Sequence, residues 1–173
     1  MGGFAVAERF LSLQGEGLHA GRRAYFIRLF GCNVRCQWCD SKSAWEGQPS
    51  ENLTAEGLAA AAAESKAEIA VITGGEPCLY DLRPLLRELS ARSIAAHLET
   101  SATLPIMEDP DAKFSWVTAS PKFFCEPLAT FLARADELKF IISEPSDLSK
   151  CEKYASAAAN AKAFWLHPEW SKA

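Results

Sequence analysis

The chain has 173 residues, of which 49% are hydrophobic and 23% charged, a balance typical of one domain with a single buried core. Its net charge of -4 and scattered Lys and Arg residues offer no basic surface for a nucleic-acid partner. No apolar run approaches the roughly 20 residues that span a bilayer, and the N-terminus lacks the features of a signal peptide. We therefore expect residues 1–173 to form one cytoplasmic domain with no membrane partner.

Short apolar runs alternate with helical patterns along the chain. Strands are predicted at residues 25–30, 68–73, 95–99, 116–119, 138–142 and 163–166. Helices are predicted at 54–63, 82–89 and 145–159, and the polar segment 41–53 is expected to be a loop. Strand–helix alternation with apolar strands predicts a parallel sheet covered by helices. Because a closed eight-fold barrel takes about 250 residues, we expect an α/β fold, an open, incomplete parallel (β/α) barrel of about six strands.

The six cysteines fall into two groups. Cys32, Cys36 and Cys39 lie within eight residues and directly follow a predicted strand, whereas the other three are far apart. Without a signal peptide, a tight triplet predicts a metal or cluster site and not a disulfide framework. Three thiolates leave one coordination position open, whereas ferredoxin clusters and structural zinc sites normally have four protein ligands. Zinc remains an alternative at this point, and the scattered cysteines are expected to be ordinary small apolar residues.

The spacing Cys-x3-Cys-x2-Cys resembles the signature of the radical S-adenosylmethionine (SAM) superfamily. The resemblance implies that Cys32, Cys36 and Cys39 ligate three irons of a [4Fe–4S] cluster and that SAM chelates the fourth. One electron from the cluster would then cleave SAM to methionine and a 5′-deoxyadenosyl radical. Residues 73–77, Thr-Gly-Gly-Glu-Pro, resemble the superfamily's Gly-Gly-Glu motif, in which a glycine allows close approach and a carboxylate suits the SAM ammonium.

Further segments narrow the resemblance to the 7-carboxy-7-deazaguanine synthase family. They are residues 10–17, 26–31, 40–41, 99–103, 120–122 and 137–140, and the likeness runs from about Glu8 to Pro168. It implies a carbon–nitrogen lyase that converts 6-carboxy-5,6,7,8-tetrahydropterin to 7-carboxy-7-deazaguanine with loss of ammonia, in deazapurine and queuosine biosynthesis. It also implies Mg²⁺ as a further cofactor, a flavodoxin- or ferredoxin-type reductant and a homodimer.

The resemblance assigns roles to individual residues. SAM would be held by Trp38, Cys39, Asp40, Gly75, Glu76, Ser101, Ser120, Pro121 and Lys122. The pterin would be lined by Leu13, Gln14, Gly15, Thr73, Thr100 and Pro168, with Arg28 pairing its carboxylate through a planar two-pronged donor. Ser41 falls where the family has a hydroxyl ligand of magnesium. This chain departs from the family at Ala102, where glycine is common, and at His167, where glutamine is usual.

Other interpretations of these residues stay open. Arg28, in an apolar strand, could form a structural ion pair, and residues 14–17 could be only a flexible turn. The runner-up function is a glycyl-radical-enzyme activase, which would act on a protein backbone and not on a small anionic substrate. A cluster-carrying electron-transfer or sensor protein is a third class, disfavoured by three clustered cysteines in place of four.

Overall fold

The structure, a computed structural model, describes residues 3–172. Within them the strands form one mixed sheet in the order β3-β1-β2-β4-β5-β6-β7-β8. The strands are β1 (Phe4–Leu13), β2 (Arg23–Leu29), β3 (Glu51–Leu53), β4 (Ile69–Gly74), β5 (Ala95–Thr100), β6 (Trp116–Ala119), β7 (Glu137–Ile142) and β8 (Ala163–Pro168). The helices are α1 (Ala55–Glu64), α2 (Arg83–Ala91), α3 (Ala129–Arg134) and α4 (Asp147–Ala157), and 3-10 turns cover Lys42–Ala44, Pro77–Leu79 and Trp170–Lys172.

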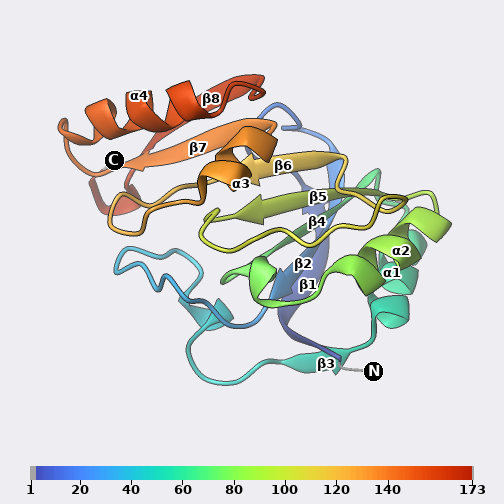
Figure 1. Cartoon of the computed structure of the whole chain (residues 1–173). Helices are drawn as coiled ribbons and strands as arrows, with labels where there is room; N and C mark the ends of the chain where they lie inside the picture. Colours follow the sequence, from blue (N-terminus) through green and yellow to red (C-terminus); the bar gives the residue numbers. More distant parts are fainter. Residues whose placement is uncertain (1–2, 173) are drawn as a thin grey trace.

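The six predicted strands correspond to β2 and β4 to β8, and each pairs with its neighbour in parallel. The sheet ends at β3 on one side and β8 on the other, so the predicted open, incomplete barrel is confirmed. In Figure 1 the arrowheads of β4 to β7 point the same way, toward the loop that follows β2. The carboxyl ends of these strands therefore share one edge of the sheet, where α/β proteins build their sites.

Two antiparallel strands were not predicted. β1 pairs with β2 and with β3, and together they extend the sheet beyond its parallel part. The prediction of a loop over residues 41–53 is wrong at its two ends, which contain the 3-10 turn Lys42–Ala44 and strand β3. β3 has only three residues and is held by backbone pairing to β1, so it shows no hydrophobic alternation that could reveal it.

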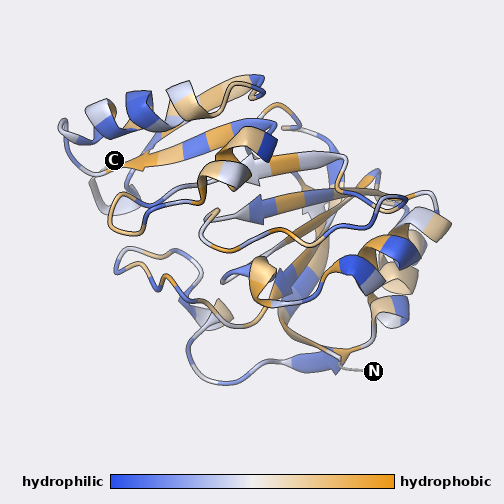
Figure 2. Cartoon of the chain, viewed as in Figure 1, coloured by the Kyte–Doolittle hydropathy of each residue, from blue (hydrophilic) through white to orange (hydrophobic). Residues whose placement is uncertain are grey.

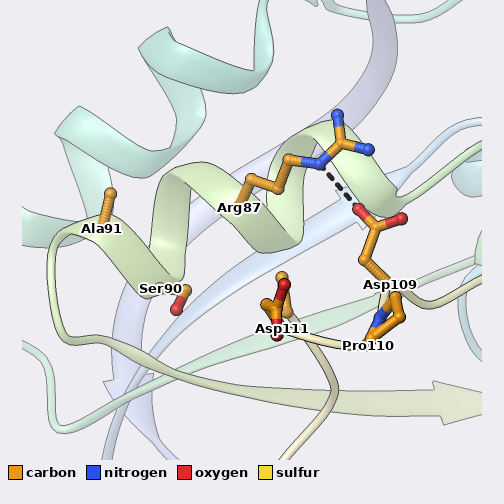
Figure 3. A pocket seen from close by; sticks show the side chains of 7 residues that line it. Arg87, Ser90, Ala91, Asp109, Pro110 and Asp111 are labelled. Carbon is orange, nitrogen blue, oxygen red and sulfur yellow. Dashed lines mark hydrogen bonds and ion pairs between the residues drawn. The ribbon is translucent and has the colours of Figure 1, made fainter.

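The three predicted helices are present as α1, α2 and α4. Thr54 caps α1 by accepting a hydrogen bond from the backbone N–H of Gly57 at 3.1 Å. The short α3 was not predicted, and the connection between β5 and β6 contains no helix. Figure 3 shows how that connection is tied down: Arg87 of α2 donates from Nε to Asp109 Oδ2 at 2.6 Å, beside a surface hollow. The hollow is a surface feature lined by this exposed ion pair together with Ser90 and Asp111.

The two faces of the sheet differ in character. The helices pack on one face, where one large hydrophobic cluster includes Leu58, Leu85, Val117, Phe131 and Phe140. Figure 2 shows hydrophobic residues along the middle strands and hydrophilic patches on α2 and α4. On the other face the buried apolar cluster is only Ala24, Phe26, Ile69 and Val71. Because side chains alternate along a strand, polar residues two positions further on, toward the carboxyl ends, lie on this inner face.

Among residues 3–172, no helix is long and apolar enough to cross a membrane.

Candidate active site

A cavity of about 540 Å³ lies on the inner face of the sheet, near the carboxyl ends of the parallel strands. It brings together residues from most of the chain. The predicted site residues that line it are Leu13, Gln14, Gly15, Arg28, Cys32, Cys36, Trp38, Cys39, Asp40, Ser41, Thr73, Gly75, Thr100, Ser101, Ser120, Lys122 and Pro168. Glu76 and Pro121 are buried behind the cavity wall and do not line it.

The three predicted cluster cysteines lie in the loop after β2, where all three line the cavity as free thiols. Backbone N–H groups already point at two sulfurs: Val34 N lies 3.4 Å from Cys32 Sγ, and Ser41 N lies 3.4 Å from Cys39 Sγ. Hydrogen bonds of this kind stabilise thiolates and tune the potential of iron–sulfur clusters. These sulfurs therefore fit a [4Fe–4S] cluster.

Burial raises the pKa of the Cys36 thiol to about 11, so iron would have to displace its proton on binding. Within the described residues, no three His, Cys, Asp or Glu side chains converge on a single-ion site.

The Gly-Gly turn after β4 packs directly on the base of the cysteine loop. A Cβ on Gly75 would overlap the carbonyl of Gly31 and lie 2.8 Å from Cys32 Cβ. Two backbone hydrogen bonds join the segments, from Gly75 N to Leu29 O at 3.1 Å and from Glu76 N to Gly31 O at 2.8 Å. Glycine is therefore required at position 75 because the turn approaches the loop that carries the cysteines, in addition to any approach to a ligand.

Glu76 has a different environment from the one its motif suggests. Its carboxylate is fully buried and accepts hydrogen bonds from Cys78 N at 3.0 Å, Thr100 Oγ1 at 2.6 Å, Ser101 N at 2.9 Å and the Ser101 hydroxyl. Four donors occupy the carboxylate, so in this structure it does not face the cavity as the direct partner of an ammonium. Glu76 reaches the cavity through Thr100 and Ser101, which both line it.

The turn that Glu76 holds is conformationally unusual. Ala102 has a φ of 64°, in the left-handed region that favours glycine. This is the position at which the chain departs from the glycine of the related family. Its backbone N–H donates to Thr100 Oγ1 at 3.2 Å, so the network around Glu76 also stabilises the strained residue.

Arg28 combines both of the roles considered for it. Its Nε donates to Glu8 Oε1 at 2.7 Å, which is the structural ion pair. The side chain is only 18% exposed and lines the cavity beside Thr73, its register partner on β4. Because Nε alone is used by Glu8, the two terminal nitrogens of the guanidinium can still bind an anion.

Residues 14–17 form more than a flexible turn. Gln14 is buried, and its Nε2 donates to Glu99 Oε1 at 2.9 Å while its Oε1 accepts from Glu16 N at 3.2 Å. Glu16 forms an ion pair with Lys139. Hydrogen bonds therefore hold this loop against β5 and β7.

Glu16, Glu99 and Lys139 also line the cavity, but they were not assigned to the site from the sequence. Burial disfavours the charged form of Lys139, yet the carboxylates of Glu99 and Glu16 outweigh burial and raise its pKa. A signal was present at β7, where Glu137 and Lys139 alternate with the core residues Leu138 and Phe140. Charged residues with a period of two in an otherwise apolar parallel strand indicate a polar inner face.

The remaining predicted residues close the cavity near the cysteines. Lys122 Nζ donates to Ser120 O at 2.5 Å and to Ser120 Oγ at 2.7 Å, and it lies 5.9 Å from the centre of the Trp38 ring. Burial lowers the pKa of Lys122 to about 8.

Ser41 Oγ donates to Asp40 Oδ1 at 3.1 Å. From the C-terminal side, Trp170 Nε1 donates to Trp38 O at 2.9 Å, which places Pro168 and Trp170 at the cavity.

The fold and the cysteine-lined cavity agree with comparisons to known proteins. Residues 26–142 match the radical SAM superfamily, and the chain belongs to this superfamily of enzymes. Its members use a [4Fe–4S] cluster and SAM, which the cysteine loop described above fits.

The chain is similar to named enzymes over nearly its whole length. It is 41% identical to 7-carboxy-7-deazaguanine synthase of a Synechocystis species, over 96% of this chain and 78% of the relative. It is 33% identical to the enzyme of the same name from Escherichia coli K12, over 92% of this chain and 81% of the relative. The crystal structure of QueE from Escherichia coli matches with a TM-score of 0.81 at 32% identity, over 96% of this chain and 84% of that chain. The chain thus belongs to the 7-carboxy-7-deazaguanine synthase family, which confirms the resemblance and disfavours the activase.

Proposed function

We propose that this enzyme converts 6-carboxy-5,6,7,8-tetrahydropterin to 7-carboxy-7-deazaguanine, with loss of ammonia, as a SAM-dependent carbon–nitrogen lyase of deazapurine and queuosine biosynthesis. The observation that carries the proposal is a single cavity lined both by the three cysteines and by Arg28. A radical generated at the cysteine loop would therefore arise in the space that holds the substrate. The names of the relatives supply the product, 7-carboxy-7-deazaguanine, and the family resemblance implies the pterin as the substrate.

The cofactors would occupy the cysteine end of the cavity. The cluster, held by Cys32, Cys36 and Cys39, supplies the electron that cleaves SAM to methionine and a 5′-deoxyadenosyl radical. SAM would be bound by Trp38, Asp40, Gly75, Ser101, Ser120 and Lys122, with Pro121 in the wall behind them. Glu76 would contribute indirectly, because its carboxylate fixes the hydroxyls of Thr100 and Ser101.

The pterin would occupy the end formed by β1, β2, β4 and β5. Arg28 would pair the substrate carboxylate, and Gln14, Gly15, Thr73 and Thr100 would contact the ring, together with Leu13 and Pro168. Ser41 would ligate a Mg²⁺ ion that the substrate also coordinates, because magnesium takes oxygen ligands and a single hydroxyl makes an incomplete site. Polar groups around a partly enclosed cavity suit a small, charged heterocycle.

Two partners belong to the proposal. A flavodoxin- or ferredoxin-type protein would supply the electron. A second copy of the chain would form a homodimer, which is supported by the edge strand β8, where Phe164 and Leu166 are 47% and 55% exposed. An unpaired edge with apolar side chains gains stability when another surface covers it.

The deciding experiment is anaerobic reconstitution of the cluster, followed by incubation with SAM, a reductant and the pterin, with and without magnesium. We expect 7-carboxy-7-deazaguanine and ammonia in equal amounts, with faster turnover when magnesium is present. The conversion is redox-neutral, so the abstracted hydrogen returns to the product, and detectable 5′-deoxyadenosine serves as the sign of SAM cleavage. Formation of 5′-deoxyadenosine without consumption of the pterin would retain the enzyme class and refute the substrate.

A further inference from the structure

Glu137, the first residue of β7, is a buried carboxylate with no role in the site described above. It is 3% exposed, does not line the cavity, and forms no ion pair with a Lys or Arg of residues 3–172. Its partners are three hydrogen-bond donors. Oε1 accepts from Thr118 Oγ1 at 2.8 Å, and Oε2 accepts from Trp165 Nε1 at 2.9 Å and from the backbone N–H of Leu18 at 3.0 Å.

Leu18 belongs to the loop between β1 and β2, so this carboxylate anchors the tip of that hairpin. Figure 1 shows the blue hairpin tip reaching across to the side of the sheet that carries β7. The adjoining Gly17 has a φ of 74°, and a Cβ there would overlap Glu137 Oε1 and lie 2.9 Å from Oε2. Gly17 and Glu137 therefore fit each other, since any other residue at position 17 would displace the loop or the carboxylate.

Hydrophobic burial contributes little at this tip, because the Leu18 side chain is 51% exposed. The ring of His19 adds an edge contact to Trp116, with centroids 4.5 Å apart. The polar anchor is Glu137. Hydrogen bonds to a carboxylate are stronger than those between neutral groups, so a buried carboxylate that accepts three of them holds its partners firmly.

The same loop carries cavity-lining residues a few positions upstream. Gln14 and Gly15 line the cavity, and so does Glu16, which pairs with Lys139. Lys139 and Glu137 lie two residues apart on the same face of β7. β7 therefore holds the loop at two points. Lys139 pairs with Glu16 beside the cavity, and Glu137 accepts from the backbone N–H of Leu18 two residues further along the loop.

We propose that Glu137 is a positioning residue for the substrate: it fixes the hairpin loop so that Gln14, Gly15 and Glu16 present their polar groups to the pterin. This inference rests on the function proposed above and adds a residue that never touches the ligand. It also accounts for Gly17, which the carboxylate requires to be a glycine.

The test compares Glu137→Ala, Glu137→Gln and Gly17→Ala in the reconstituted enzyme, with Glu51→Ala as a control on an exposed ion pair. Glu137→Ala should raise the KM for the pterin by roughly tenfold or more, because three donors, on the loop, on β6 and on β8, lose their acceptor. SAM affinity should be unchanged. Glu137→Gln should retain most of the wild-type KM, because its amide oxygen can accept from Leu18 and Trp165 while its amide nitrogen donates to the Thr118 hydroxyl.

Hydrogen–deuterium exchange gives a readout that is independent of turnover. Peptides covering residues 14–22 should exchange faster in Glu137→Ala and in Gly17→Ala, and at the wild-type rate in Glu137→Gln and Glu51→Ala. If Glu137→Ala unfolds globally, Gly17→Ala carries the test, because it disturbs the contact between the loop and the carboxylate and leaves Glu137 itself in the buried strand.

Two outcomes would overturn the positioning role while leaving the proposed function intact. One is an unchanged exchange rate of the loop in both disruptive variants, and the other is a faster loop with an unchanged KM for the pterin. A wild-type enzyme that cleaves SAM but does not convert the pterin would refute the proposed function and the positioning role together.

Discussion

Glu76 accepts hydrogen bonds from both the backbone N–H and the hydroxyl of Ser101, although the two residues are 25 positions apart. Through this contact the end of β4 is joined to the end of β5 directly behind the cavity. The carboxylate also accepts hydrogen bonds from Cys78 N and Thr100 Oγ1, so each of its hydrogen-bond partners is a donor. Such a site requires two acceptor oxygens.

Glu76→Gln should therefore be poorly tolerated. Whichever way its amide is oriented, the NH₂ group would face a backbone N–H, that of Cys78 or that of Ser101. A buried donor without an acceptor costs about 1–3 kcal/mol, so we expect the free energy of unfolding to fall by that amount and SAM affinity to fall with it. Urea denaturation and SAM titration measure both, and Glu56→Gln on the exposed side of α1 is the control. Wild-type stability in Glu76→Gln would contradict the network.

The cysteines should separate into two functional groups. Alanine at Cys32, Cys36 or Cys39 should abolish the brown chromophore after reconstitution and with it SAM cleavage, because a cluster loses an iron ligand. Alanine at Cys78, Cys125 or Cys151 should leave both unchanged. Iron content and visible absorption measure the outcome, and loss of the chromophore in Cys125→Ala would contradict the assignment.

Arg28→Ala should weaken pterin binding specifically. Removing one partner of a buried charge pair costs about 3–5 kcal/mol, which corresponds to roughly 150-fold to 5,000-fold in affinity. SAM affinity should hold, because Arg28 projects from β2 and not from the cysteine loop. Arg9→Ala, which breaks an exposed pair with Glu51, is the matched control and should have little effect. An equal loss of both ligands in Arg28→Ala would indicate a purely structural role.

Ser41 tests the magnesium part of the proposal. Ser41→Ala should reduce turnover and blunt the response to added magnesium without bleaching the cluster, because a hard cation loses an oxygen ligand. Ser41→Thr should keep both properties, since the hydroxyl is retained. If the wild-type rate ignores magnesium after thorough chelation, Ser41 has another role, such as the hydrogen bond it makes to Asp40.

His97 should make stability depend on pH. It is buried on β5 beside Trp116 and His19, and burial lowers its pKa to about 4, from 6.5 when unfolded. The unfolded chain then binds a proton that the folded chain does not, so stability is complete above pH 6.5 and falls as the pH drops toward 4. The loss reaches at most about 3 kcal/mol. Urea unfolding of wild type and His97→Gln between pH 4 and 7.5 measures it, and an equal slope in the two proteins would exclude His97 as the cause.

Much of the fold could be predicted because each parallel strand is a short run of mostly apolar residues that can be recognised without its neighbours. β2 and β4 to β7 are largely buried, and together with the edge strand β8 they read as short apolar runs. Helix α2 shows Leu85, Leu86 and Leu89 on one face. β1 and β3 lacked so clear a signal, because Glu8 and Arg9 interrupt the apolar residues of β1 and β3 is only three residues long. Backbone pairing holds them in place, and a local pattern of side chains does not reveal pairing.

The chemistry at the cysteine end of the cavity was determined by the sequence itself, because three thiolates within eight residues can reach one cluster through local chain geometry alone. The tertiary structure decided which distant groups complete the site. Gln14 meets Glu99 across 85 residues, and Leu18 meets Glu137 across 119. The motif predicts that Glu76 contacts the ligand, but hydrogen-bond donors at the end of the next strand hold its carboxylate inside the cavity wall. A carboxylate's role depends on the donors that surround it, and strands far apart in the chain bring those donors together.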